Sequence, residues 1–240
     1  MKVTRPRFVP DASSSHDEMK RLQHDIADNA VFSDGRDARL DADTRIAGVD
    51  QAFDGETAVS AVVVMQDGEI IERVHAARPV KIPYIPGLLS FREGGAIVAA
   101  LQNLEREPDV LLVDGCGRMH FREAGLATHI GVTFDVPAIG VAKSLLCGTP
   151  TESTENLDEG NRVPIEADGT VTAPDGSVIG YAVQTRQYRS PNRYINPVYV
   201  SPGHRISAET AVDAVVRAVD GYKLPEPVRQ ADQYAGEVTA

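Results

Sequence analysis

The segment RIAGVDQAFDGETAVSAVVVMQDGEIIERVH, residues 45–75, carries the pattern that decides the fold. It divides into three runs of β-branched and apolar residues, which are residues 45–53, 58–66 and 69–75. An Asp-Gly pair follows each of the first two runs, and the second pair, Asp67-Gly68, is typical of a two-residue hairpin loop. The sequence therefore predicts an antiparallel meander of three strands.

Short apolar runs beyond the meander predict strands that are buried on both faces, namely residues 109–114 (DVLLVD) and 138–142 (AIGVA). Further strands are expected near residues 178–185 and 197–200. Apolar residues at helical spacing predict helices at residues 15–29, 94–106 and 208–219. Ser207 is placed to cap the last of these helices. A meander followed by alternating helices and strands indicates an α/β fold with a central mixed β-sheet flanked by helices.

The remaining segments show no such periodicity. Residues 1–44 are expected to form an N-terminal region, with a loose tail at 1–15, the helix at 15–29 and a polar loop at 30–44. Residues 149–177 are acidic and rich in turn residues, and we expect an exposed hairpin insert there. At 240 residues the chain suits one domain, which we place at 45–232, followed by a C-terminal tail at 233–240.

The composition is acidic, and its basic residues are unevenly chosen. The formal charge is −11 at pH 7, only five of the 24 basic residues are lysines, and tryptophan is absent. This balance is typical of a cytosolic protein from a halophilic organism, and it argues against a protein that binds phosphates by bulk electrostatics. We see neither an apolar run of the ~20 residues that span a bilayer nor a secretory signal. We expect a cytoplasmic protein with no membrane partner, in which Cys116 and Cys147 are free thiols.

Two aspartates stand where buried strands lose their apolar character. Asp50 follows the run Ile46–Val49, and Asp114 follows the run Val110–Val113. A lone carboxylate beside an apolar core is disfavoured by desolvation, whereas two carboxylates in one crevice could hold a hard cation such as Mg²⁺. Glu93 could supply a third carboxylate. Aspartates after strands also serve as caps and turns, so this spacing alone leaves both interpretations open.

Longer motifs add a resemblance to a known family. The stretches are IAGVDQAF (46–53), PYIPGLLSFRE (83–93), VDGCGRMH (113–120), VPAIGVAKSLLCG (136–148), PGHRIS (202–207) and YKLPEPVRQAD (222–232). In order and register they resemble the endonuclease V family from about residue 45 to 232. The resemblance implies an RNase H-like fold and a Mg²⁺-dependent endonuclease, with Mn²⁺ able to substitute. It also implies recognition of hypoxanthine, the base left when adenine is deaminated, and hydrolysis of the second phosphodiester bond on its 3′ side in DNA repair.

The resemblance also implies roles for individual residues. The metal-ligand aspartates of the family fall on Asp50 and Asp114, and its third acid falls on Glu93. Its basic residue near the scissile phosphate falls on Lys143, and its active-site histidine falls on His204. Each role is chemically reasonable, because a metal ion activates water and a nearby ammonium group neutralises charge at the phosphate.

Further residues are implied to contact the nucleic acid. Pro83-Tyr84-Ile85-Pro86 resembles the wedge that the family inserts into a duplex when the damaged base is flipped out. His120 matches a histidine near the phosphates. Gly115 would lie beside the base, and Leu146 would lie in the pocket wall. Cys116 stands where the family commonly has histidine, which puts the local hydrogen bonding in doubt rather than the activity.

Alternatives remain open at this stage. DNA containing deoxyinosine is the expected partner, but relatives in this family differ in their preference for DNA or RNA, so an inosine-specific endoribonuclease is the nearest rival. A structure-specific repair nuclease with the same fold is a more distant one. From another class, the chain could be an inactive binder of distorted nucleic acid, although all of the implied catalytic side chains are present. We expect a monomer, because this chemistry needs no second copy.

Overall fold

The predicted meander forms three neighbouring antiparallel strands, β1 (Ile46–Asp54), β2 (Thr57–Gln66) and β3 (Glu69–Pro79). The computed structural model that contains them describes residues 1–35, 41, 43–188, 190 and 192–239. Between β2 and β3, Asp67 and Gly68 have φ values of 50° and 76°, as a tight hairpin turn requires. The prediction of this meander is therefore confirmed.

The meander forms one edge of a single nine-stranded sheet. The other strands are β4 (Val110–Asp114), β5 (Ala138–Ala142), β6 (Thr149–Pro150), β7 (Arg162–Glu166), β8 (Val178–Val183) and β9 (Val198–His204). Their order across the sheet is β3-β2-β1-β4-β5-β9-β8-β7-β6. β1, β4 and β5 run parallel, while the other neighbouring pairs are antiparallel. The sheet is thus mixed, as predicted.

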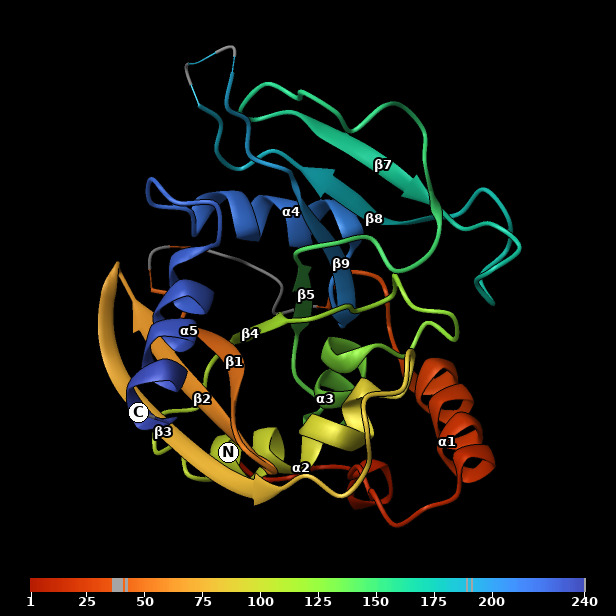
Figure 1. Ribbon diagram of the computed structural model, residues 1–240, viewed down its shortest axis with the longest axis vertical. Coiled ribbons are helices and arrows are strands. Elements are labelled where there is room, and N and C mark those ends of the chain that lie inside the picture. Colours follow the sequence, from red (N-terminus) through yellow and green to blue (C-terminus); the bar gives the residue numbers. More distant parts are fainter. Residues whose placement is uncertain (36–40, 42, 189, 191, 240) are drawn as a thin grey trace.

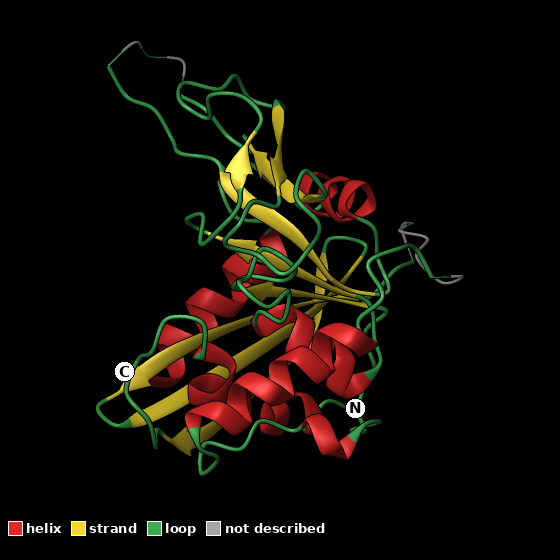
Figure 2. Ribbon diagram, turned by 90° about the vertical axis from the view of Figure 1, so that its right-hand side faces the viewer, coloured by secondary structure: helices red, strands yellow, loops and turns green. Residues whose placement is uncertain are grey.

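Helices cover both faces of this sheet. They are η1 (Pro6–Phe8), α1 (His16–Asn29), α2 (Leu89–Gln102), α3 (Leu126–Phe134), α4 (Ala208–Arg217) and α5 (Glu226–Thr239). α2 and α3 pack on one face, with α1 outside α3, whereas α4 and α5 lie on the other (Figure 1). Figure 2 shows most helices around the lower half of the molecule, below the loop-rich part that carries β7 and β8. In the part of the chain that is described, no helix is long and apolar enough to cross a membrane.

Three helices differ from the predictions. α2 begins at Leu89 rather than Gly94, because burial of Leu88 and Phe91 anchors its first turn ahead of the glycine pair. α3 was not predicted, since all nine of its residues are buried and it has no polar face to create a period. α5 continues to Thr239, so the expected tail at 233–240 is helical over most of its length.

One segment that we expected to be loose is built into the molecule. Phe8 is buried, and the amide groups of Thr4 and Arg5 both donate to the carbonyl oxygen of Thr133 in α3, so residues 1–15 are not a loose tail. In residues 149–177, β6 pairs with β7 as an antiparallel hairpin at the edge of the sheet, and most of the residues between the two strands are exposed. The segment also buries Ile165 in a cluster shared with Met119, Cys147 and Ile179. Residues 36–40 and 42 of the loop expected at 30–44 lie outside the described residues.

Candidate active site

The alternation of side chains along β1 and β4 places two aspartates on the same face. Val49 and Val113 pack in the core between the sheet and helices α2 and α3. Their successors, Asp50 and Asp114, therefore point to the opposite face, toward α5. The parallel pairing of β1 with β4 ends at Val49 and Val113, so the two aspartates come next in register. The structure brings together the two residues that we predicted as metal ligands.

The local setting of Asp50 differs from the prediction in one respect. We expected Asp50 at the end of a strand, but β1 continues to Asp54 along β2. β4 stops at Asp114, however, and its end leaves the upper part of β1 without a neighbour on that side. The two carboxylates thus lie at a step in the sheet, where backbone no longer fills the space beside β1.

A third carboxylate comes from α5, and the sequence reasoning missed it. A Cβ atom on Gly48 would lie 1.9 Å from the carbonyl oxygen of Pro227, so glycine at this position is what lets α5 pack directly on β1. This close approach brings the carboxylate of Asp232 within hydrogen-bonding reach of Asp50. The buried positions Val228 and Ala231 have helical spacing and could have indicated the helix that carries Asp232.

The electrostatics of this cluster favour binding of a cation. The pKa of Asp50 is raised to about 8, mainly by burial. The charge of Asp114 and hydrogen bonds with Asp114 and Asp232 also raise it, and the hydrogen bond from the Gln51 amide only partly opposes them. Burial likewise raises the pKa of Glu93 to about 7; Arg92 opposes this shift and Asp114 adds to it. Negative charge is therefore concentrated here beyond what the protein itself neutralises.

One lysine contacts the cluster. The ammonium group of Lys143, just after β5, lies 2.8 Å from a carboxylate oxygen of Asp114. Its side chain is 52% exposed, whereas that of Asp114 is 16% exposed. Lys143 can therefore reach both the acids and a group arriving from solvent, which is the position we predicted for it.

The carboxylates suit a hard cation in their chemistry, although they do not form a complete cage. Asp50, Asp114, Asp232 and Glu93 offer only oxygen donors, which Mg²⁺ prefers. Among the described residues, no three His, Cys, Asp or Glu side chains are gathered closely enough to hold a metal ion by themselves. Mg²⁺ is commonly held by one or two carboxylates and completes its shell with water and substrate phosphate, so a site with few protein ligands fits it.

His204 does not belong to this cluster, which corrects our prediction. It ends β9 opposite Ala138, at the far end of β5 from Lys143. Leu111 pairs with Ala138, so His204 lies level with a residue three positions before Asp114, about 10 Å down the strand. The imidazole is fully buried; it accepts a hydrogen bond from the amide of Val31 and contacts Asp135 at 3.1 Å.

The chemistry of His204 is that of a structural residue. Burial lowers the pKa of His204, and the hydrogen bond with Asp135 only partly opposes that shift. Because Nδ1 accepts from Val31, we assign the ring proton to Nε2, which donates to Asp135. Asp135 also pairs with Arg5 and Arg205, so His204 ties the end of β9 to the N-terminal segment.

The proline-flanked loop predicted as a wedge projects its aromatic tip from the surface. Tyr84 is 63% exposed, whereas the neighbouring Ile85 packs against the buried residues Met19, Leu88 and Phe91. Pro83 and Pro86 stand exposed on either side. The loop therefore combines an apolar anchor with a free tip.

Three side chains hold the end of this loop through a single carbonyl group. The carbonyl oxygen of Gly87 accepts hydrogen bonds from Gln23 Nε2 at 2.8 Å, His120 Nε2 at 3.1 Å and Arg122 Nη2 at 3.2 Å. Burial lowers the pKa of His120 to about 4, so its ring is neutral at pH 7. His120 Nδ1 accepts from the amide of Arg122, which leaves the proton on Nε2. We call this arrangement the Gly87 clamp; it places His120 beneath the loop, not free in solvent.

A cavity of about 200 Å³ opens beside the loop and the acids. Its lining includes Tyr84, Gly115, His120 and Leu146, four of the residues that we predicted to contact the nucleic acid. Cys116 also lines it, and burial, with a contribution from the charge of Asp114, raises the pKa of its thiol to about 11. Both cysteines are free, as predicted, and Cys116 offers a neutral thiol where the family commonly has an imidazole.

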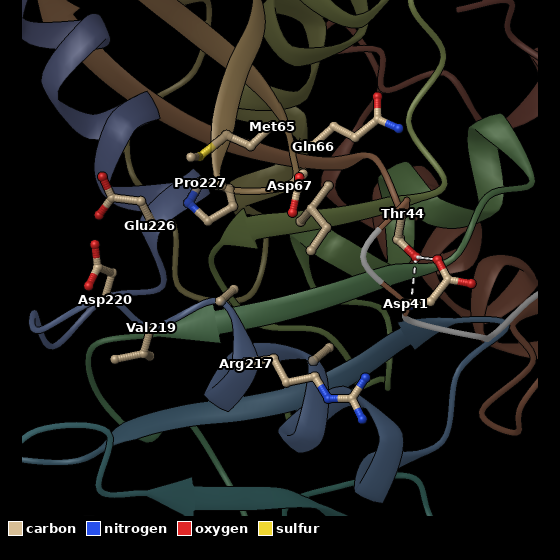
Figure 3. Close-up of a pocket in the computed structure, with 14 residues that line it drawn as sticks. Asp41, Thr44, Met65, Gln66, Asp67, Arg217, Val219, Asp220, Glu226 and Pro227 are labelled. Carbon is tan, nitrogen blue, oxygen red and sulfur yellow. Dashed lines mark hydrogen bonds between the residues drawn. The ribbon is translucent and has the colours of Figure 1, made fainter.

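A larger cavity of about 530 Å³ lies elsewhere (Figure 3). Its walls come from the β2–β3 hairpin and from the segments around α4 and α5, and they include Met65, Asp67, Arg217 and Glu226. It adjoins Ile46 at the start of β1, four residues before Asp50. Because it is remote from the acids and Lys143, we assign the chemistry to the smaller cavity.

Comparison with known proteins decides the family. A profile of the endonuclease V family matches residues 28–233 of this chain. This chain belongs to the endonuclease V family. The endonuclease V of Haloarcula marismortui is 60% identical over 98% of this chain and 97% of its own length. That of Natronomonas pharaonis is 58% identical over 100% and 98% of the two chains. The expected family, with relatives in halophilic archaea, is thereby confirmed.

Solved endonuclease V structures share the fold. The catalytic domain of human endonuclease V has a TM-score of 0.80 at 32% identity, covering 92% of this chain and 94% of that one. Endonuclease V of Ciona intestinalis, solved with a 24-mer DNA containing an inosine followed by a ribo-adenosine, has a TM-score of 0.76 at 28% identity, covering 92% and 96%. The predicted RNase H-like α/β fold and the assignment to an endonuclease are confirmed.

Proposed function

We propose that this protein nicks DNA at deoxyinosine, hydrolysing the second phosphodiester bond on the 3′ side of the lesion with Mg²⁺ as the cofactor. The observation that carries the proposal is the position of the carboxylate cluster beside a base-sized cavity and an exposed aromatic tip. Mn²⁺ has the same charge and also binds oxygen ligands, so we expect it to substitute for Mg²⁺. The proposed role is the repair of deaminated adenine.

Each residue of the cluster has a part in this proposal. Asp50 and Asp114 would hold Mg²⁺, with Asp232 within hydrogen-bonding reach of Asp50, and the bound ion would supply Lewis-acid activation of the phosphate and of a water molecule. Lys143, already 2.8 Å from Asp114, would move its ammonium group onto the scissile phosphate and stabilise the charge that develops there. Glu93, with a pKa of about 7, would accept a proton from the attacking water.

The remaining contacts position the substrate. The base leaves the duplex and enters the 200 Å³ cavity between Gly115 and Leu146, while Tyr84 fills the gap left in the stack. Rotation of the base into the cavity sets the nearby backbone against Lys143 and the acids. The chain carries every group in this scheme itself, so a monomer suffices. Two free thiols suit the reducing cytoplasm, where we place the protein.

The test uses the purified protein in 2 M KCl and a labelled duplex with one deoxyinosine opposite thymine. We expect one nick at the second 3′ phosphodiester bond with Mg²⁺, none with EDTA, and none on the same duplex with adenine. Asp114→Asn serves as the matched inactive variant. A nick at another bond, or equal cutting of the adenine duplex, would overturn the proposal.

A parallel arm decides between DNA and RNA. The substrate bound by the Ciona protein contains a ribonucleotide after its inosine, which makes an RNA substrate worth the direct comparison. Matched single strands of DNA and RNA, each with one inosine, are cut in the same buffer. Faster cutting of the RNA strand would reassign the protein as an inosine-specific endoribonuclease.

A further inference from the structure

The 200 Å³ cavity beside the acids is narrow and largely apolar. Its walls include Leu89 at the start of α2, Leu126 at the start of α3 and Leu146 after β5. Pockets for drug-sized ligands usually measure ~300–1,000 Å³, so this one suits a single flat ring system. Apolar walls hold a base by contact but do not tell one purine from another, and discrimination must come from a few polar groups.

Two polar side chains of this cavity, those of Gln23 and His120, are already engaged within the protein. Gln23 uses its amide nitrogen on the carbonyl groups of Gly87 and Ala124, and its oxygen accepts from Arg122. His120 uses both ring nitrogens in the Gly87 clamp. These groups shape the cavity, but they have little capacity left for a ligand.

Ser90 is different. It is the second residue of α2, it lines the cavity and it is only 2% exposed. Within the described part of the chain its hydroxyl group has no hydrogen-bond partner. Buried hydroxyl groups in native proteins are almost always bonded, so an unbonded one on a residue in the wall of a cavity points to a ligand that completes it.

The start of α2 determines which ligand atom is favoured there. No side chain caps this helix, whose N-cap residue is Leu88. The amide groups of the first helical turn have no partner within a helix, and the helix dipole adds positive potential at this end. Leu89 and Ser90 both line the cavity. The cavity wall at this point therefore favours an acceptor oxygen over an amino group.

We infer that the Ser90 hydroxyl group donates a hydrogen bond to the 6-keto oxygen of the flipped hypoxanthine base and so reads the atom that deamination creates. The inference rests on the proposed function. Adenine carries an amino group at the same position, which would meet the donors at the start of α2 with another donor. Ser90 is thus a specificity-determining residue for this reaction and takes no part in the bond cleavage itself.

The experiment compares two lesions in the wild-type protein and in Ser90→Ala. One duplex carries deoxyinosine, and the other carries the deoxynucleoside of unsubstituted purine, which lacks the 6-keto oxygen. We expect Ser90→Ala to lower kcat/KM on deoxyinosine about 5- to 10-fold, as loss of one neutral hydrogen bond implies. On the purine lesion it should leave the rate unchanged. The ratio of affinities for the deoxyinosine and purine duplexes is also measured by equilibrium binding with Ca²⁺ in place of Mg²⁺. A lesion that is bound but not cut therefore still gives a readout.

Ser60→Ala is the matched control. Ser60 on β2 is also fully buried, its hydroxyl group likewise has no partner among the described residues, and it does not line the cavity. The Ser60→Ala variant should leave unchanged the ratio of kcat/KM on deoxyinosine to kcat/KM on the purine lesion. Equal losses on both lesions in Ser90→Ala, or no loss on deoxyinosine, would overturn the inference. If the wild-type protein fails to nick deoxyinosine at all, the proposed function fails first, which the wild-type lane shows separately.

Discussion

Replacing Asp50 by asparagine should stabilise the metal-free protein at neutral pH while it removes activity. Asp50 has a folded-state pKa of about 8 against an ordinary value of 3.8. The folded protein thus keeps a proton that the unfolded chain loses, so the stability that Asp50 contributes is complete below about pH 4. It is lost as the pH rises toward 8. The slope is about 1.4 kcal/mol per pH unit for one such group.

The magnitude follows from that slope. Between pH 5 and 7 the wild-type protein should lose about 3 kcal/mol of unfolding free energy through Asp50 alone. Glu93, whose pKa is raised to about 7, adds to the loss in the same direction. Asparagine does not titrate, so Asp50→Asn should fall less steeply by the Asp50 share. At pH 7 without metal the variant should be the more stable protein, by up to about 4 kcal/mol.

The assay is urea unfolding in 2 M KCl with EDTA at pH 5, 6 and 7, repeated with Mg²⁺. Binding of Mg²⁺ to the folded state should restore the wild-type protein by about 2.7 kcal/mol at a concentration one hundred times Kd, and should restore the variant less. A wild-type stability that stays flat or rises from pH 5 to 7 in EDTA would refute this reasoning. So would a variant that is less stable than wild type at pH 7.

Three further predictions separate the roles assigned above. Asp232→Asn should lower the single-turnover rate at least about 100-fold by removing a carboxylate that adjoins the metal ligand Asp50. His204→Gln should keep the rate within about 3-fold and instead lower the urea midpoint. The reverse pattern would restore His204 to the site. Tyr84→Ala should weaken binding and cutting of inosine in duplex DNA more than in single strands, and equal losses on both would show that the loop has only a structural role. With a net charge of −11, the thermal midpoint and the cleavage rate should both rise from 0.05 M toward 3 M KCl as screening shortens the Debye length from about 14 Å to below 3 Å; optima near 0.1 M would contradict the halophilic interpretation.

The strands near the acids could be predicted from sequence because each is marked by a run of neighbouring residues. Residues 45–75 alternate between β-branched runs and Asp-Gly turns, and β4 and β5 are unbroken apolar runs. α3 could not be found in the same way, since a helix buried all round shows no period. α2 was placed five residues late because the Pro/Gly-rich stretch 79–93 indicated irregular structure, and its sequence does not show the tertiary burial of Phe91.

The candidate site was predicted where a polar residue follows or interrupts an apolar run. Asp50, Asp114 and Lys143 each follow or interrupt an apolar run, and the structure brings them together. Asp232 depends on a helix that we took for the border of a tail, and on the absence of a side chain at Gly48. His204 was placed by resemblance alone, and no local pattern showed which end of β9 it would occupy.

The Gly87 clamp has a consequence for the energetics of binding. Fixing the backbone of one mobile residue costs about 1–2 kcal/mol of conformational entropy. A loop that becomes ordered only when its ligand binds therefore weakens the affinity by that amount for each residue. Here the cost is met during folding, because three donors already hold the carbonyl group behind Tyr84. One of those donors, Gln23, belongs to α1. The N-terminal helix therefore sets the rigidity of the aromatic tip, and binding of the duplex should proceed without a disorder-to-order step at that loop.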